Sequence, residues 1–288
     1  MLNAIPSNAA APFDHLLRTA LVHFDAAQTD HAAALCAQAL ALKPLDPAAW
    51  ILQGEIHRRR GHLSEAIAAF QNAATHAPTV AFAHLRLARA LLDARRFSDA
   101  LAAADQALRC DPASLEALNI RGLCVLGLGH PADAVEPLQH VLRHCPDDLQ
   151  TLSNLGLALT ATNRPAEALP LLEHAVALDP RHTAALTNLA LARMHTHQYA
   201  AAIAAARGVV AIEPSVTIYN NWIAAATALG DIPEALAALR NALALATSAG
   251  TDSTAADLGS ALLLTLHYDP QLSPDALFHA HQEWNARH

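Results

Sequence analysis

Small apolar residues recur at one phase along this chain, with a spacing of 34 residues. Around each of them, the apolar and polar positions predict two antiparallel helices joined by a short turn. In the unit of residues 81–114, the first helix is predicted over Ala81–Ala94 and the second over Ser98–Cys110. The recurring small residues fall in the second helices, where they allow the two helices of a pair to pack closely. They are Ala66, Ala100, Ala134 and Ala168.

The predicted second helices carry recognisable start signals. Ser64 and Ser98 each precede an acidic residue, a pattern that predicts an N-cap followed by a favourable charge in the first turn. In the next two units Pro131 and Pro165 take the equivalent place, which suits proline because the first helical position needs no backbone N–H.

Prolines with the same spacing mark the predicted ends of the second helices, because proline cannot donate the helical hydrogen bond and disfavours helix just before it. The phase extends back to Phe13 and forward, one residue short, to Ser248. We therefore expect seven helix pairs. The prolines in register are Pro44, Pro78, Pro112, Pro146, Pro180 and Pro214.

The 34-residue unit resembles the tetratricopeptide repeat, a helix pair that stacks on its neighbours. One unit matches the repeat pattern at Trp50, Gly54, Ala66, Phe70 and Pro78. It departs from the pattern at Gln53 and His57, which replace a leucine and a tyrosine. The resemblance covers residues 13–250 and implies an all-α fold, a right-handed superhelical solenoid of about seven helix pairs plus C-terminal helices. Residues 1–12 are expected to form a flexible N-terminus.

Composition narrows the classes of function. The formal net charge of −8 argues against nucleic-acid binding, which requires a basic surface. The four cysteines show no paired spacing, no signal peptide is apparent, and no stretch is apolar enough to span a membrane. We expect a cytoplasmic protein that does not contact membranes.

Three asparagines share one position in the predicted first helices of the later units. They are Asn154, Asn188 and Asn221, each two residues before the repeat glycine or its substitute. The first helices of such a stack line its concave wall. A row of carboxamides there could donate to and accept from the backbone of an extended peptide whatever its sequence. The alternative is a structural role, in which these asparagines form hydrogen bonds between neighbouring repeats.

The repeat spacing stops after Ser248, and residues 251–288 form a different segment. A helix is predicted over Asp257–His267, and Ser273 caps a second helix that begins at a proline. The run from Leu263 to Trp284 resembles the junction of bacterial O-linked N-acetylglucosamine transferase-like proteins of the SPINDLY group. There it joins the repeats to a glycosyltransferase region, and the asparagine row also resembles that family. The resemblance implies junction contacts by Tyr268, Phe278, His281 and Trp284.

No chemistry beyond binding is expected from this chain. His288, the last residue, stands where the catalytic region of that family would begin, and no glycine-rich nucleotide-binding motif occurs. The pair His140 and His144, beside Cys145, has a metal-binding spacing but no further ligand, so neither a metal nor another cofactor is expected.

Three hypotheses remain: the acceptor-recognition superhelix of a glycosyltransferase-like protein, a free-standing adaptor that binds a peptide or protein, and the repeat region of a sulfotransferase or other enzyme. In each of them this polypeptide by itself is a binding scaffold and not an enzyme.

Overall fold

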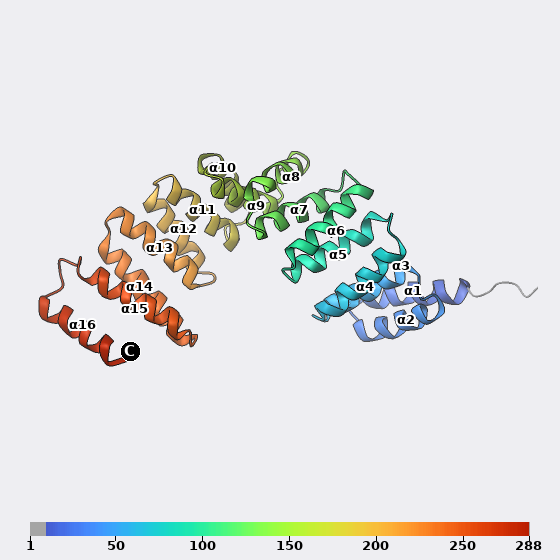
Figure 1. Ribbon diagram of the computed structural model, residues 1–288, viewed down its shortest axis with the longest axis horizontal. Helices are drawn as coiled ribbons and strands as arrows, with labels where there is room; N and C mark the ends of the chain where they lie inside the picture. Colours follow the sequence, from blue (N-terminus) through green and yellow to red (C-terminus); the bar gives the residue numbers. More distant parts are fainter. Residues whose placement is uncertain (1–9, 288) are drawn as a thin grey trace, which may run out of the picture. The chain divides into compact units, whose positions relative to one another are not determined.

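The computed structural model describes residues 10–287, and sixteen α-helices occupy most of that range, without a β-strand among the described residues (Figure 1). The first eight are α1 (Ala10–Asp25), α2 (Thr29–Leu42), α3 (Pro47–Arg59), α4 (Leu63–His76), α5 (Ala81–Asp93), α6 (Phe97–Cys110), α7 (Leu115–Gly127) and α8 (Pro131–His144). The others are α9 (Leu149–Ala161), α10 (Pro165–Leu178), α11 (Thr183–His195), α12 (Tyr199–Val210), α13 (Val216–Leu229), α14 (Ile232–Ser248), α15 (Asp252–Leu266) and α16 (Pro274–Arg287).

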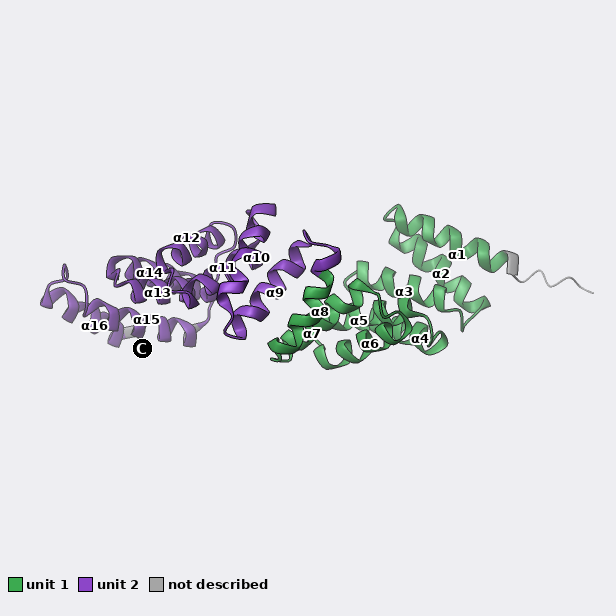
Figure 2. Ribbon diagram, turned by 90° about the horizontal axis from the view of Figure 1, so that it is seen from above, with its two compact units in different colours: residues 1–141 green, residues 142–288 purple. Residues whose placement is uncertain are grey.

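The helices form two compact units, unit 1 with residues 1–141 and unit 2 with residues 142–288 (Figure 2). Within each unit, consecutive helices form antiparallel pairs, such as α3 with α4 and α9 with α10. The second helix of a pair also packs against the first helix of the next, as α4 does against α5 and α10 against α11. The expected all-α array of helix pairs is confirmed, and α14 ends at Ser248 as predicted.

The start of the array differs slightly from the expectation. Helix α1 begins at Ala10, three residues before Phe13, so part of the segment expected to be flexible is helical. Residues 1–9, which make up the rest of that segment, lie outside the described part of the chain.

In the seven pairs from α1 to α14, the turn between the two helices contains one residue in the left-handed conformation. In unit 1 these residues are Ala27, Gly61, Arg95 and Gly129, with φ between 56° and 81°. The next residue donates its N–H to a carbonyl five residues earlier, as His62 does to His57 at 2.9 Å. This pattern closes the first helix and places the following residue at the start of the second.

The turn geometry overturns the prediction that Ser64 and Ser98 are N-caps. Helices α4 and α6 begin at Leu63 and Phe97, one residue before these serines, and no side chain caps either helix. The serines lie inside the first turn, where they cannot act as N-caps. Pro131 and Pro165, by contrast, occupy the first positions of α8 and α10 as predicted.

The prolines in register follow the ends of the second helices as predicted. Helices α2 and α4 end two residues before Pro44 and Pro78, whereas α12 ends at Val210, four residues before its proline. The carbonyl of a register proline can also hold the next helix. Trp50 Nε1 donates to the carbonyl of Pro44 at 2.7 Å, and His84 Nε2 lies 2.9 Å from that of Pro78.

In the pairs that begin with α3, α7 and α9, close approach of the two helices depends on a glycine at the eighth position of the first helix. A methyl group built on Gly54 would lie 2.5 Å from the ring of Phe70, and one on Gly156 would lie 2.5 Å from Leu172. Gly122 meets Leu138 in the same way. The predicted alanines Ala66, Ala100, Ala134 and Ala168 are all fully buried on the second helices.

The last two helices continue this packing although the spacing has stopped. Helix α15 begins at Asp252, five residues earlier than predicted, and packs against α14. Its Gly259 lies directly under the ring of Trp284 on α16, which repeats the contact of Gly54 with Phe70. Ala280 precedes Trp284 by four residues, as Ala66 precedes Phe70. Helices α15 and α16 therefore form an eighth, more loosely packed pair with a longer turn.

Replacing Gly156 with alanine should destabilise unit 2 by about 1–2 kcal/mol, because the cost of overpacking against Leu172 exceeds the gain in helix propensity. The matched control is Gly208→Ala in α12, where the new methyl would lie at an ordinary 3.7 Å from Leu186. It should stabilise by up to about 1 kcal/mol, since only helix propensity changes. Urea unfolding of the variants measures both effects.

The double variant Gly156→Ala/Leu172→Ala should be more stable than Leu172→Ala alone, because the added methyl partly fills the cavity. A strictly additive double variant would contradict the proposed contact.

Candidate functional site

The first helices of the pairs line the inner side of the bend within each unit. In unit 1, α3 packs against α5 and α5 against α7; in unit 2, α9 packs against α11 and α11 against α13. Among the described residues, α2, α4 and α6 make no such contacts with one another, and neither do α10, α12 and α14. The first helices are therefore closer together than the second helices, which makes their shared surface the inner one.

The structure places the three predicted asparagines at one position of unit 2, which we call the asparagine row. Asn154, Asn188 and Asn221 are each the sixth residue of their helices α9, α11 and α13. Their surroundings nevertheless differ. Asn154 is only 7% exposed, whereas Asn188 and Asn221 are partly buried.

The amide groups of the row are engaged to different extents. Asn154 Oδ1 accepts from Gln150 Nε2 at 3.3 Å, while its buried Nδ2 has no hydrogen-bond partner. Asn188 Nδ2 donates to both the carbonyl and the Oγ of Ser153, each at 3.1 Å. This bond joins α11 to α9, so Asn188 has the structural role that was the alternative to ligand binding. Asn221 makes no side-chain hydrogen bond to any described residue.

The four residues proposed as junction contacts differ in how far they are buried. Trp284 packs on Gly259, and the ring of His281 lies edge-on to that of His267 at 5.3 Å. Tyr268 and Phe278, in contrast, are 67% and 60% exposed. His281 and Trp284 are thus turned towards the α15 segment, whereas Tyr268 and Phe278 leave most of their side-chain surface exposed.

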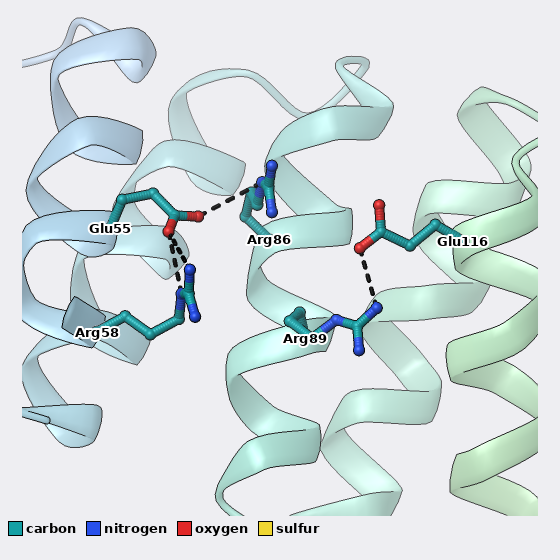
Figure 3. A network of polar contacts seen from close by, with 5 residues as sticks. All are labelled: Glu55, Arg58, Arg86, Arg89 and Glu116. Carbon is teal, nitrogen blue, oxygen red and sulfur yellow. Dashed lines mark hydrogen bonds and ion pairs between the residues drawn. The ribbon is translucent and has the colours of Figure 1, made fainter. Parts of the chain in front are cut away.

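Unit 1 carries a charged cluster on its own inner surface, formed by α3, α5 and α7, which sequence reasoning did not identify (Figure 3). Glu55 Oε2 accepts from Arg58 Nε at 3.0 Å and from Arg58 Nη2 at 2.8 Å. Glu55 Oε1 lies 3.5 Å from Arg86 Nε on α5, and Arg89 donates to Glu116 on α7 at 3.1 Å. Only the pair Glu55 and Arg58, three residues apart on one helix, could have been found from the sequence.

The buried thiols are not suited to nucleophilic chemistry. Burial raises the pKa of Cys36 to about 12, and burial together with Asp105 raises the pKa of Cys124 to about 11. Both thiols therefore stay protonated near neutral pH. Within residues 10–287, no group of three potential ligands that could hold a metal ion comes together. No described helix has both the length and the apolar character needed to cross a bilayer.

Comparisons with known families match both units. The profile of the Psidin N-terminal tetratricopeptide repeat region matches residues 83–246, more than half of the chain, and a general tetratricopeptide repeat profile matches residues 17–81. The chain belongs to the tetratricopeptide repeat family. The 34-residue helix pairs are thus tetratricopeptide repeats, as their resemblance implied. No curated protein sequence matches this tetratricopeptide protein.

Solved structures share the fold. A tetratricopeptide repeat protein from Parabacteroides merdae is 18% identical, with a TM-score of 0.62 over 89% of this chain and 99% of its own. YrrB, described as having an unusual peptide-binding site, is 18% identical, with a TM-score of 0.53 over 64% of this chain and 94% of its own. A thermophilic tetratricopeptide protein from Thermus thermophilus is 25% identical, with a TM-score of 0.52 over 64% of this chain and 100% of its own.

We expect His57 to make the stability of unit 1 depend on pH. Burial lowers the pKa of His57; Glu65 opposes this shift, and His62 and Arg60 add to it. The unfolded chain therefore binds the proton more readily. The contribution of neutral His57 to stability is complete above about pH 6.5, the pKa of histidine in the unfolded chain. It is lost as the pH falls from there through the lower pKa of His57 in the folded protein.

Urea unfolding at pH 7.5 and 5.5 should show a smaller loss for His57→Gln than for the wild type. The variant His76→Gln, which changes an exposed histidine in α4, should lose stability as the wild type does. Equal losses in all three proteins would exclude His57 as the cause.

Proposed function

We propose that this tetratricopeptide protein is a binding scaffold whose unit 2 holds an extended segment of another polypeptide along the inner surface of α9, α11 and α13. The proposal is carried by one observation: every asparagine of the row keeps hydrogen-bonding capacity that the described residues do not use. Asn154 retains a donor, Asn188 retains its carbonyl oxygen, and Asn221 retains both groups.

Spare amide groups suit the backbone of an extended chain, which presents a donor and an acceptor at nearly every residue. The neutral side chains of the row do not select a charge on the ligand. Because Asn188 and Asn221 are only partly buried, they are the members that a ligand can reach most directly. YrrB, which shares the fold and has a peptide-binding site, is consistent with this class of ligand.

Asn221→Ala should weaken binding of unrelated ten-residue peptides by a similar factor of about 3–10 each, because each loses roughly one hydrogen bond of about 1 kcal/mol to its backbone. Fluorescence anisotropy with a labelled panel of peptides measures the affinities. The matched control is Asn220→Ala, which removes the exposed neighbouring amide on α13 and should leave binding unchanged.

Urea unfolding, combined with the same peptide panel, separates a role of Asn188 in peptide binding from its role in stability. Asn188→Ala should also lower the free energy of unfolding by about 1 kcal/mol, since it removes the bond to Ser153, whereas Asn221→Ala should not. If neither variant changes affinity for any peptide that the wild type binds, the row is structural and the proposal fails.

A second candidate function is acceptor recognition for an O-linked N-acetylglucosamine transferase-like protein. It is favoured by the run from Leu263 to Trp284 and by the exposed Tyr268 and Phe278, which could contact a following region. The sequence encoded directly after codon 288 tests it. A nucleotide-sugar-binding region there would support this candidate, and an unrelated reading frame would count against it. Sugar transfer by the purified chain alone would contradict the expectation that it is not an enzyme.

A further inference from the structure

Of the three arginines in the charged cluster of unit 1, Arg86 is the one without a hydrogen-bond partner among the described residues. Glu55 is only 14% exposed in its side chain and lies between two arginines. Its Oε2 takes both hydrogen bonds from Arg58. Its Oε1 is 3.5 Å from Arg86 Nε, and neither atom has a hydrogen-bond partner although both are buried. The Glu55 carboxylate therefore lies between two guanidinium groups but accepts hydrogen bonds only from Arg58.

The neighbouring charges do not relieve this imbalance. Arg89, one turn further along α5, donates to Glu116 of α7, which therefore already has a partner. Figure 3 shows Arg86 above Arg89 along α5, with Glu55 and Glu116 on the helices to either side. Among the described residues no group accepts a hydrogen bond from Arg86. Its side chain is 30% exposed, so a ligand can reach the guanidinium.

An exposed aromatic ring lies directly beside this cation. The guanidinium of Arg86 is 4.6 Å from the ring centroid of Phe82, one turn earlier on α5. Phe82 is 45% exposed, which is unusual for so large an apolar side chain. Stacking on Phe82 holds the guanidinium in place, so less conformational entropy is lost when it binds a carboxylate.

We propose that Arg86 and Phe82 form a binding subsite for an acidic residue of a polypeptide, with the carboxylate on Arg86 and an adjacent apolar side chain on Phe82. This subsite lies in unit 1 and is separate from the asparagine row. It rests on the proposed function only in taking a polypeptide as its ligand. Glu55 and Glu116 close by disfavour more highly charged anions, so a single carboxylate suits the site better than a nucleic acid does.

Two matched ten-residue peptides test the subsite, one with a single glutamate and one with a glutamine in its place. Wild-type protein should bind the glutamate peptide at least tenfold more tightly than the glutamine peptide at low salt. Arg86→Gln should remove most of this preference, and Phe82→Ala should weaken the binding of both peptides. The control Arg121→Gln removes an arginine that has its own partner, Asp105 at 3.1 Å, and should leave the preference unchanged.

Glu55→Gln is the decisive variant, because it removes the carboxylate that competes with the ligand for Arg86. It should raise affinity for the glutamate peptide about three- to tenfold and leave the glutamine peptide unaffected. A purely structural role of the cluster predicts no gain. Equal binding of the two peptides by the wild type, or no gain in Glu55→Gln, would overturn the subsite. Asn221→Ala should keep the glutamate preference, so failure of either proposal can be told apart from failure of the other.

Discussion

The close approach of the two helices in each pair is the constraint on which the rest of this structure depends. In three pairs a glycine at the eighth position of the first helix accepts a large side chain sixteen residues later, as Gly54 accepts Phe70. Where that position holds Ala88, its counterpart is the small Ala104, and both are fully buried. The two positions therefore compensate each other in size, as expected for an interior packed to constant density.

This contact also decides which residues can serve a ligand. The sixth residue of a first helix lies two positions before the small residue, or about 200° around the helix axis. When the small residue faces the partner helix, the sixth residue must face away from it, towards the inner surface. Arg86, Asn154 and Asn188 all occupy that position. The inner surface is thus a consequence of the packing, and its chemistry can vary without disturbing the pair.

Features set by local spacing could be predicted from the sequence, and features set by contacts between helices could not. The proline spacing predicted the seven pairs that end at Ser248 and the shared position of the asparagines, because both follow from a fixed repeat length. The helix starts at Leu63 and Phe97 were missed by one residue, since the left-handed turn residue determines them. The eighth pair was missed because 25 residues separate Gly259 from Trp284, where other pairs have sixteen. The contact of Glu55 with Arg86, across two helices, leaves no short-range pattern.

The inner surfaces of the two units differ in which polar groups are already paired within the fold. In unit 1, a carboxylate shared by two arginines must favour one of them, because the Arg58 bonds are short and local while the distance to Arg86 is 3.5 Å. In unit 2, neutral amides can bond to each other and to Ser153 without leaving a net charge. An unbalanced charge attracts one kind of ligand group, whereas a spare amide accepts any backbone. In the two proposals made above, the same helix position would serve charge-selective recognition in one unit and sequence-independent recognition in the other.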